Sequence, residues 1–432
     1  MSERTLPVSQ LLKLSVYWFG ILTIWGSLNK IVLPARVDEI DPAHAGTLLF
    51  VINAVAVIAA ILVQPTIGVI SDYTTSRWGR RKPYIVIGAV LDVVFLLGIA
   101  SSQSYLSLLA FLVLLQVSSN FAQGPFQGYV PDLVPAHQVG LASGLMGAMI
   151  VLGQIAGVGI GSLGLALDNL FLTTISVGVI EVLTMVVLVT SVNEGTVGPR
   201  RTRSWPRIAL SAWGLDILGE RNVLWLLGVR LLFLGAVAST SFGLFYFERS
   251  HGLPQAEAGG VLFLGTLIVG VMTAAAAVPG GRLSDRIGRK PIIYASCGLA
   301  AAGMAGVAIA PTPVLAIVAF VPFGLGTGAF LSVDWALMTD VIPKETAGRY
   351  MGILNAGTAA AEPLFLAVAG IALDFVGRTV SIGAGPRAAM IVAVIFLGGS
   401  AVLLTRVDPS RRDAADGLAM AEALPGSTAP AA

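Results

Sequence analysis

Between two long apolar runs lies the stretch Gly68-Val-Ile-Ser-Asp72-Tyr-Thr-Thr-Ser-Arg77-Trp-Gly79-Arg80-Arg81-Lys82-Pro83, which is polar and strongly basic. A second copy, Gly281-Arg-Leu-Ser-Asp285-Arg-Ile-Gly288-Arg289-Lys290-Pro291, occurs in the other half of the chain. The first glycine after the Asp comes seven positions on in the first copy and three in the second, so the first copy is longer by four residues. Two apolar hairpins that are closed by the same loop predict an internal repeat.

The composition is that of a membrane protein with several spans. Of the 432 residues, 56% are hydrophobic and 12% are charged, and the mean hydropathy is +0.85. Soluble domains carry about 25% charged residues. The single Cys297 excludes a disulfide framework and a cysteine-based metal site. Residues 1–7 lack the segment order of a signal peptide, so the first apolar run is expected to remain as a span.

The sequence has twelve apolar runs long enough to cross a bilayer. They lie near 12–34, 46–70, 84–102, 106–130, 138–163 and 170–191, and then near 223–247, 257–279, 291–310, 313–338, 350–373 and 387–405. The predicted fold is an all-α membrane protein with twelve transmembrane helices in two pseudo-symmetric six-helix bundles. The bundles are expected at 1–191 and 223–405, joined by a cytoplasmic linker at 192–222 and followed by a disordered cytoplasmic tail at 406–432. The linker is either a short helix on the membrane surface or a plain tether.

Basic residues predict which side of the membrane each loop faces. With both termini inside, 20 of the 26 Lys and Arg residues lie on the inner side. Five lie on the outer side, namely Lys30, Arg36, Arg249, Arg378 and Arg387. Because cytoplasmic loops are enriched in Lys and Arg, we expect a multi-pass protein of the cytoplasmic (inner) membrane with both termini in the cytoplasm.

The repeat extends to the connections after the fourth and tenth spans. Asp132, after the fourth, recurs as Asp340, after the tenth, at an offset of 208 residues. Both lie on the side of the basic loops, where ion pairs with arginines could form in one conformation and break in another. The gating candidates are Asp72, Arg77, Gly79, Arg80, Arg81, Asp132, Asp285, Gly288, Arg289 and Asp340. The alternative is a basic cluster that sets topology and binds anionic lipid.

The fourth predicted span carries amide side chains at a helical spacing. Gln116, Asn120, Gln123 and Gln127 are separated by four, three and four residues, so they share one helix face. Amides offer donors and acceptors without charge, which suits a neutral polyhydroxylated solute. The alternative is that they hydrogen-bond between helices and hold the bundle together. Trp25 is a further candidate, for stacking on a sugar ring, although interfacial tryptophan is common in spans.

Ionisable residues inside spans are functional candidates because their burial is costly. Glu362 lies twelve residues into the predicted span 350–373, about 18 Å along a helix and hence near the midplane. Its counterpart at the offset of 208 is Gln154, a further candidate for the solute site. Glu362 either binds a coupling proton or cation, or forms a structural pair with Arg230 of the seventh span.

The two basic loops resemble those of the major facilitator superfamily, in which Gly-x-x-x-Asp and a following Gly-Arg-Lys/Arg recur in both halves. The resemblance covers residues 10–405. The longer first loop and the run Asn120-Phe-Ala-Gln123-Gly124-Pro125 are similar to the plant sucrose transporter and glycoside-pentoside-hexuronide branch. The resemblance implies that a small solute, with a sugar as the expected class, moves by alternating access between two halves. Gln116 and Gln127 stand where sucrose transporters carry an acid and an arginine, so proton coupling is not expected at those positions.

Three other acids lie within predicted spans. Asp334, beside Trp335, belongs either to the cavity or to the gate near Asp340. Asp92 and Glu181 fall on the third and sixth spans, which the resemblance makes peripheral, so we expect structural or interfacial roles for them.

The resulting prediction is a secondary active transporter of a small polar solute, with coupling to H+ or Na+ as a hypothesis and no other cofactor. Two alternatives stay open: an exporter of amphipathic compounds, and a non-transporting membrane receptor or assembly factor. The expected partners are the solute and the lipid bilayer, without nucleic acid, and a monomer is expected. Enzyme activity and a metal site are not expected, because His44, His137 and His251 lie far apart at span ends.

Overall fold

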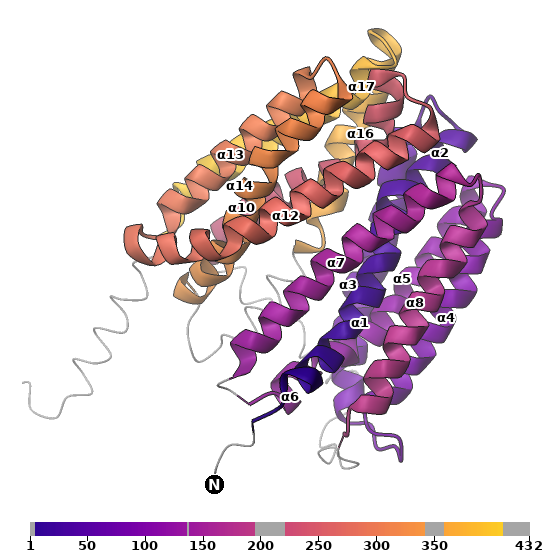
Figure 1. The fold of residues 1–432 in the computed structure, drawn as a ribbon, viewed down its shortest axis with the longest axis vertical. Coiled ribbons are helices and arrows are strands. Elements are labelled where there is room, and N and C mark those ends of the chain that lie inside the picture. The colour runs from indigo at the N-terminus through magenta and orange to yellow at the C-terminus, as the bar shows by residue number, and fades with distance from the viewer. Residues whose placement is uncertain (1–4, 136–137, 195–220, 342–357, 409–432) are drawn as a thin grey trace, which may run out of the picture.

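The structure is a computed structural model that describes residues 5–135, 138–194, 221–341 and 358–408. The regular secondary structure in these ranges is helical, and eleven helices are long and apolar enough to cross a membrane. The predicted all-α membrane fold is therefore confirmed (Figure 1).

The N-terminal half contains six spans close to the predicted positions. The first is α1 (Val8–Ser27), which continues through the π-helical segment η1 (Leu28–Val32) into α2 (Leu33–Ile40). The others are α3 (Ala45–Asp72), α4 (Lys82–Ser101), α5 (Tyr105–Gln127), α7 (Val139–Ala166) and α8 (Leu170–Ser191), and the short α6 (Tyr129–Leu133) follows α5.

The C-terminal half begins with a span that changes helix type along its length. It consists of α10 (Arg221–Val237), the 3-10 segment η4 (Ala238–Phe242), α11 (Gly243–Phe245) and the π-helical segment η5 (Tyr246–Ser250). It is followed by α12 (Gln255–Ile287), α13 (Arg289–Ile309), α14 (Pro313–Val341), α16 (Ala361–Thr379) and α17 (Ala384–Leu404).

The described helices differ in extent from the predicted spans at 257–279 and 350–373. Helix α12 continues to Ile287 and does not end near 279, because the second loop motif stays helical and Gly288, at φ +94°, makes the turn. The predicted span 350–373 begins in residues that lie outside the described ranges, and α16 is its described part. Most of the predicted linker and tail also lies outside those ranges, so the domain boundaries stay predictions.

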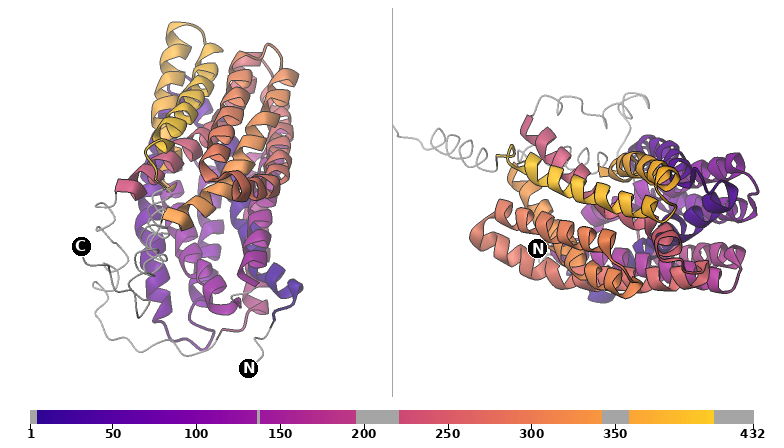
Figure 2. Two further views of the ribbon diagram at one scale, coloured as in Figure 1. Left: turned by 90° about the vertical axis from the view of Figure 1, so that its left-hand side faces the viewer. Right: turned by 90° about the horizontal axis from the view of Figure 1, so that it is seen from above.

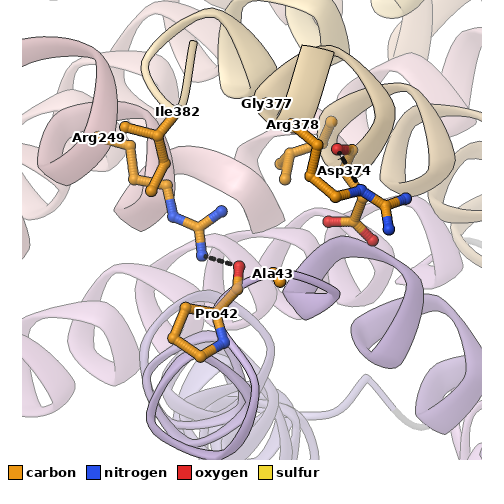
Figure 3. A pocket seen from close by; sticks show the side chains of 8 residues that line it. Pro42, Ala43, Arg249, Asp374, Gly377, Arg378 and Ile382 are labelled. Atoms are coloured by element: carbon orange, nitrogen blue, oxygen red, sulfur yellow. Dashed lines mark hydrogen bonds between the residues drawn. The ribbon is translucent and has the colours of Figure 1, made fainter.

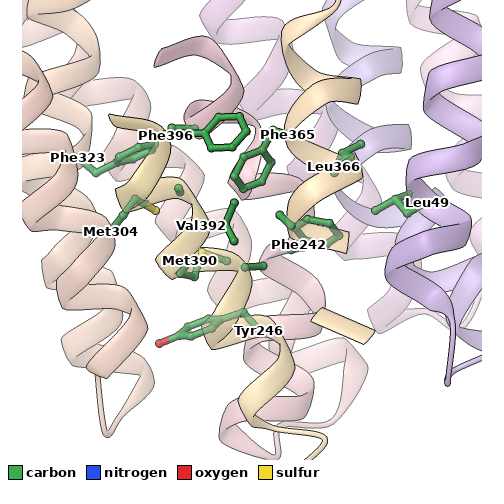
Figure 4. Packing of buried hydrophobic residues seen from close by; sticks show 14 of the residues in the cluster. Leu49, Phe242, Tyr246, Met304, Phe323, Phe365, Leu366, Met390, Val392 and Phe396 are labelled. Carbon is green, nitrogen blue, oxygen red and sulfur yellow. The ribbon is translucent and has the colours of Figure 1, made fainter. Parts of the chain in front are cut away.

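Apolar side chains fill the C-terminal half and join it to α3. The ring of Phe365 lies 6.2 Å from that of Phe242 and 5.3 Å from that of Phe396, measured between centroids. Leu49 of α3 and Leu366 of α16 are fully buried and point toward one another across the halves (Figure 4). Apolar packing therefore holds the halves together at this level.

The two halves converge at the end of the bundle that holds the connection 41–44, which we call the opposite end (Figures 1 and 2). We call the other end, which holds the loop 73–81, the basic-loop end. Helix α7 of the N-terminal half packs against α12 of the C-terminal half. Near the opposite end, Ser162 Oγ donates to the Gly259 carbonyl at 2.7 Å. The ribbons of the two halves diverge toward the basic-loop end (Figure 1).

Candidate functional site

Arg81 of the first basic loop is the centre of an ion-pair network. Its Nη2 lies 2.7 Å from Asp72 Oδ1 and 2.8 Å from Asp132 Oδ2. Its Nη1 donates to a carbonyl oxygen in the last turn of α5 at 3.1 Å. Arg80 also pairs with Asp132. The structure thus brings together four of the predicted gating residues, three from this stretch and Asp132 from α6, whereas Arg77 is exposed.

Glu194, which the sequence analysis did not single out, completes this network. Its carboxylate accepts the backbone N–H of Arg81 at 2.8 Å and of Lys82 at 3.0 Å, and also the Tyr129 hydroxyl. A carboxylate at the first turn of α4 is favoured by the helix dipole. Burial, together with the Glu194 charge, raises the pKa of the Tyr129 phenol well above its usual value. Gly79, at φ +110°, brings the chain against Glu194.

Among the described residues, the second basic loop makes contacts within its own hairpin. Arg289 Nη1 donates to Ser284 Oγ at 2.9 Å and to Asp285, one helical turn earlier. Gly288 forms the whole connection between α12 and α13. Asp340, the predicted partner, lies in α14, and its side chain is outside what the structure describes.

Glu362 lies where the two halves meet. Ser241 Oγ donates to Glu362 Oε1 at 3.0 Å from the C-terminal half, and Asn29 Nδ2 approaches Oε2 at 3.5 Å from the N-terminal half. Lys30 lies near enough for its charge to act on Glu362, and its Nζ donates to Gln154 Oε1 at 3.3 Å. Glu362 and its repeat counterpart Gln154 thus belong to one polar cluster. A carboxyl with donors from both halves is able to bind a proton or a small cation.

The segments that carry this cluster depart from α-helical geometry. Asn29 and Lys30 lie in η1 and Ser241 lies in η4, and such irregular turns are frequent at functional sites. Pro34 lacks the N–H that would bond to the Lys30 carbonyl, which accounts for the π turn in the first span. Lys30 therefore belongs to the span and not to the outer loop, which corrects its place in the count of basic residues.

Arg230 does not pair with Glu362, which corrects the predicted structural pair. Its Nη1 lies 2.5 Å from Asp334 Oδ2, and both side chains are buried. The pair follows from the contact of α10 with α14, where the rings of Phe233 and Phe330 stack at 3.6 Å one turn away. Asp334 is therefore the buried counter-ion of Arg230.

The amide stripe of α5 is partly bonded to itself. Asn120 Nδ2 donates to Gln116 Oε1 at 3.0 Å and to the Gln116 carbonyl at 2.8 Å. Gln123 Nε2 donates to Ser119 Oγ at 2.9 Å, whereas Gln127 is exposed. The stripe thus keeps free amide acceptors and donors along one face.

The neighbours of α5 show where this stripe points. Gly124 packs against the backbone of α3, and Ala122 packs against Gly88 of α4. Phe126 lies edge to face with Tyr17 of α1 at 5.0 Å. Helix spacing then leaves the stripe on the face between α1 and α3. Trp25 is half-buried on α1, among the apolar side chains of the core.

Polar contacts join the halves at the opposite end. Arg249 pairs with Asp38 and donates to the Pro42 carbonyl at 3.0 Å. Asp374 accepts the N–H of Gly46 at 3.0 Å and of Thr47 at 2.7 Å. A pocket of about 270 Å³ lies between these contacts (Figure 3). The sequence predicts Arg249 as an outer charge but does not indicate these partners.

Two glycines bring the backbones of the halves into direct contact at the same end. A Cβ on Gly46 would lie 2.6 Å from the Gly370 carbonyl oxygen, and one on Gly370 would lie 2.5 Å from that of Gly46. Arg378 and His44 add a hydrogen bond of 3.0 Å across the halves. The opposite end is therefore tightly closed in this structure.

A family model matches most of the amino-acid sequence. The family model described as the Major Facilitator Superfamily matches residues 13–357 and again 268–425. Sucrose transport protein SUT1 of Oryza sativa subsp. japonica is 33% identical over 128 residues, which are 24% of this chain and 24% of that protein. Sucrose transport protein SUC4 of Arabidopsis thaliana is 29% identical over 170 residues, which are 35% of this chain and 33% of that protein. The matches thus span about a quarter to a third of these relatives.

Solved structures share the fold over nearly the whole chain. The nucleoside transporter NupG superposes with a TM-score of 0.68 at 15% identity and covers 92% of this chain and 98% of its own. A D-xylose-proton symporter superposes with a TM-score of 0.69 at 18% identity and covers 94% of this chain and 98% of its own. At these identities the likeness concerns the fold alone.

Proposed function

Because the chain belongs to the Major Facilitator Superfamily, and is therefore a membrane transporter rather than an enzyme, we propose that it moves a sugar or glycoside across the cytoplasmic membrane by alternating access. We further propose that Glu362 binds a proton or Na+ whose movement is coupled to that of the solute. No other cofactor is required by this proposal.

The observation that carries the proposal is the position of Glu362 between the halves. Its carboxyl takes a hydrogen bond from Ser241 of one half and faces Asn29 and Lys30 of the other. Relative movement of the halves would change these contacts, so the affinity of Glu362 for a cation would differ between the two states. Such a difference is what coupling needs.

The proposed solute class rests on neutral polar groups. The stripe from Gln116 to Gln127 offers amides on the face of α5 between α1 and α3, and Gln154 lies beside Lys30. Two relatives that match part of the chain are sucrose transport proteins. A sugar hydroxyl can both donate to and accept from such amides.

The closed opposite end supports an assignment of the conformational state. With the basic loops in the cytoplasm, as their Lys and Arg content favours, the halves are joined on the outer side by Arg249, Asp374 and Gly46. We therefore propose that the structure is the inward-facing state. The Arg81 network would then hold the basic loop in place while the inner ends are apart.

Uptake by proteoliposomes tests the proposal. We expect an imposed pH or Na+ gradient to drive accumulation of radiolabelled sucrose or another glycoside by the wild type. Glu362→Gln is expected to abolish gradient-driven accumulation while solute exchange without a gradient persists. Glu39→Gln, at an exposed position, serves as the matched control and is expected to behave as the wild type.

Two results would contradict the proposal separately. Gradient-driven accumulation by Glu362→Gln at the wild-type level would remove the coupling role of this residue. If no sugar or glycoside in a panel that includes mono- and disaccharides is taken up, the proposed solute class is wrong. The coupling role of Glu362 would then be tested with other solutes.

A further inference from the structure

Two acidic side chains inside the N-terminal half take no part in the proposed solute site. Asp92 lies near the middle of the 20-residue helix α4, and Glu181 lies near the middle of the 22-residue helix α8. Both residues are 0% exposed. Their carboxyl groups lie within hydrogen-bonding reach of each other. Two acids are therefore in contact at membrane depth.

The groups that face the two carboxyls are hydroxyls. Tyr17 of α1 donates to Glu181 Oε1 at 3.2 Å, and Ser118 of α5 donates to Asp92 Oδ1. Ser119 of α5 also lies within reach of Asp92. In the described parts of α1, α4, α5 and α8, no Lys or Arg side chain interacts with either acid. Tyr17 is the other titratable group that faces the pair.

In each of the two carboxyl groups, one oxygen atom has no hydrogen-bond partner among the described residues. Asp92 Oδ2 and Glu181 Oε2 are buried, and neither accepts a hydrogen bond within the described chain. Two ionised carboxylates repel and cannot donate to one another, and an unpaired charge is costly to bury. One proton on either carboxyl turns it into a donor for the other, so the remaining oxygens can share a hydrogen bond.

We propose that Asp92 and Glu181 form a proton-binding site that holds one proton between α4 and α8, separate from Glu362. The pair then carries one negative charge, which the hydroxyls of Tyr17 and Ser118 stabilise. Loss of the proton would leave two carboxylates in contact inside the half. The bound proton therefore stabilises the N-terminal half, and alkaline pH removes this stabilisation.

Infrared spectroscopy of the purified full-length protein detects such a proton directly. The wild type and Glu362→Gln are expected to show the carbonyl stretch of a protonated carboxylic acid, sensitive to exchange into D2O. The double variant Asp92→Asn/Glu181→Gln is expected to lose the intensity of one carboxyl from this band. An unchanged band in the double variant would overturn the proposal, and the wild-type measurement does not depend on any variant folding.

Thermal unfolding in detergent gives an independent test. We expect the wild-type midpoint to fall as the pH rises from neutral to alkaline. Glu181→Gln, whose amide donates to Asp92 without a titrating proton, is expected to flatten this dependence. The exposed control Glu39→Gln is expected to keep the wild-type slope, and an equal slope in Glu181→Gln would contradict the proposal.

A sodium ion is the competing occupant of this site. Unfolding at fixed neutral pH in Na+ and in choline distinguishes the two ligands. We expect equal midpoints in the two salts. A higher unfolding midpoint in Na+ than in choline, present in the wild type and absent in Glu181→Gln, would indicate that the site binds a sodium ion. This result would overturn the assignment of a proton.

Discussion

The two basic loops share a motif but are held in different ways. Arg81 is 5% exposed and reaches Asp72, Asp132 and the end of α5. Arg289 reaches Ser284 and Asp285 in the preceding turn of its own hairpin. The first loop is also longer by four residues, and its described contacts extend to α5 and α6. The same charges thus recur in both halves, but among the described residues their contacts differ.

The largest effect is expected when Arg81, the central arginine of the first loop, is removed, and its counterpart Arg289 gives the comparison. Arg81→Ala leaves Asp72 and Asp132 without their common partner, so we expect the free energy of unfolding to fall by roughly 2–3 kcal/mol. Arg289→Ala is expected to lower it less, because the contact that the described residues show, with the largely exposed Asp285, is a weak pair. Thermal unfolding of the two variants measures the difference, and equal losses would show that the loops are held alike.

Each basic loop contains one glycine at positive φ, Gly79 in the first and Gly288 in the second. Both Gly79→Ala and Gly288→Ala are expected to destabilise the protein by roughly 1–2 kcal/mol through backbone strain. At Gly79 a Cβ would also lie 2.8 Å from the Glu194 side chain, whereas at Gly288 the nearest atom is 3.8 Å away. We expect the larger loss at Gly79. The added cost of Gly79→Ala in a Glu194→Ala background, measured against Glu194→Ala alone, separates the two causes, because the carboxylate clash is gone and the strain remains.

A smaller loss than that of Arg81→Ala is expected at Tyr129, whose hydroxyl contacts Glu194 in the network of the first loop. Tyr129→Phe removes the hydrogen bond to Glu194 and is expected to cost about 1 kcal/mol at neutral pH. Because the pKa of the Tyr129 phenol is raised in the folded state, its contribution is present below about pH 10 and is lost as the pH rises further. Unfolding midpoints of both proteins, followed from neutral to strongly alkaline pH, should converge. A constant difference would contradict the assignment.

The sequence predicted the spans well because apolar length dominates the energetics of a helix in lipid. It also placed Asp72, Arg80, Arg81 and Asp132 on one side, where the structure joins them. Glu194 was missed because it follows the sixth span at the start of the linker. A carboxylate directly after a span, on the side of a basic loop, is the signal that could have identified it.

Partners between distant helices were harder to predict. The spacing of Arg230 and Glu362 within their helices fixes the face on which each lies, but not the neighbouring helix. Because α10 packs against α14, Arg230 forms its ion pair with Asp334 instead. Likewise, the sequence did not indicate that Asn29 and Lys30 lie beside Glu362, because only the packing of the halves brings them there.

The contact between Gly46 and Gly370 has a practical consequence. Since the two backbones touch where each residue lacks a side chain, one added methyl group at either position would act as a wedge between the halves. It would not alter the Glu362 cluster or the basic loops. A small steric change of this kind offers a route to trap the conformer in which the opposite end is open, for example as a sample for imaging or for the selection of conformation-specific antibodies.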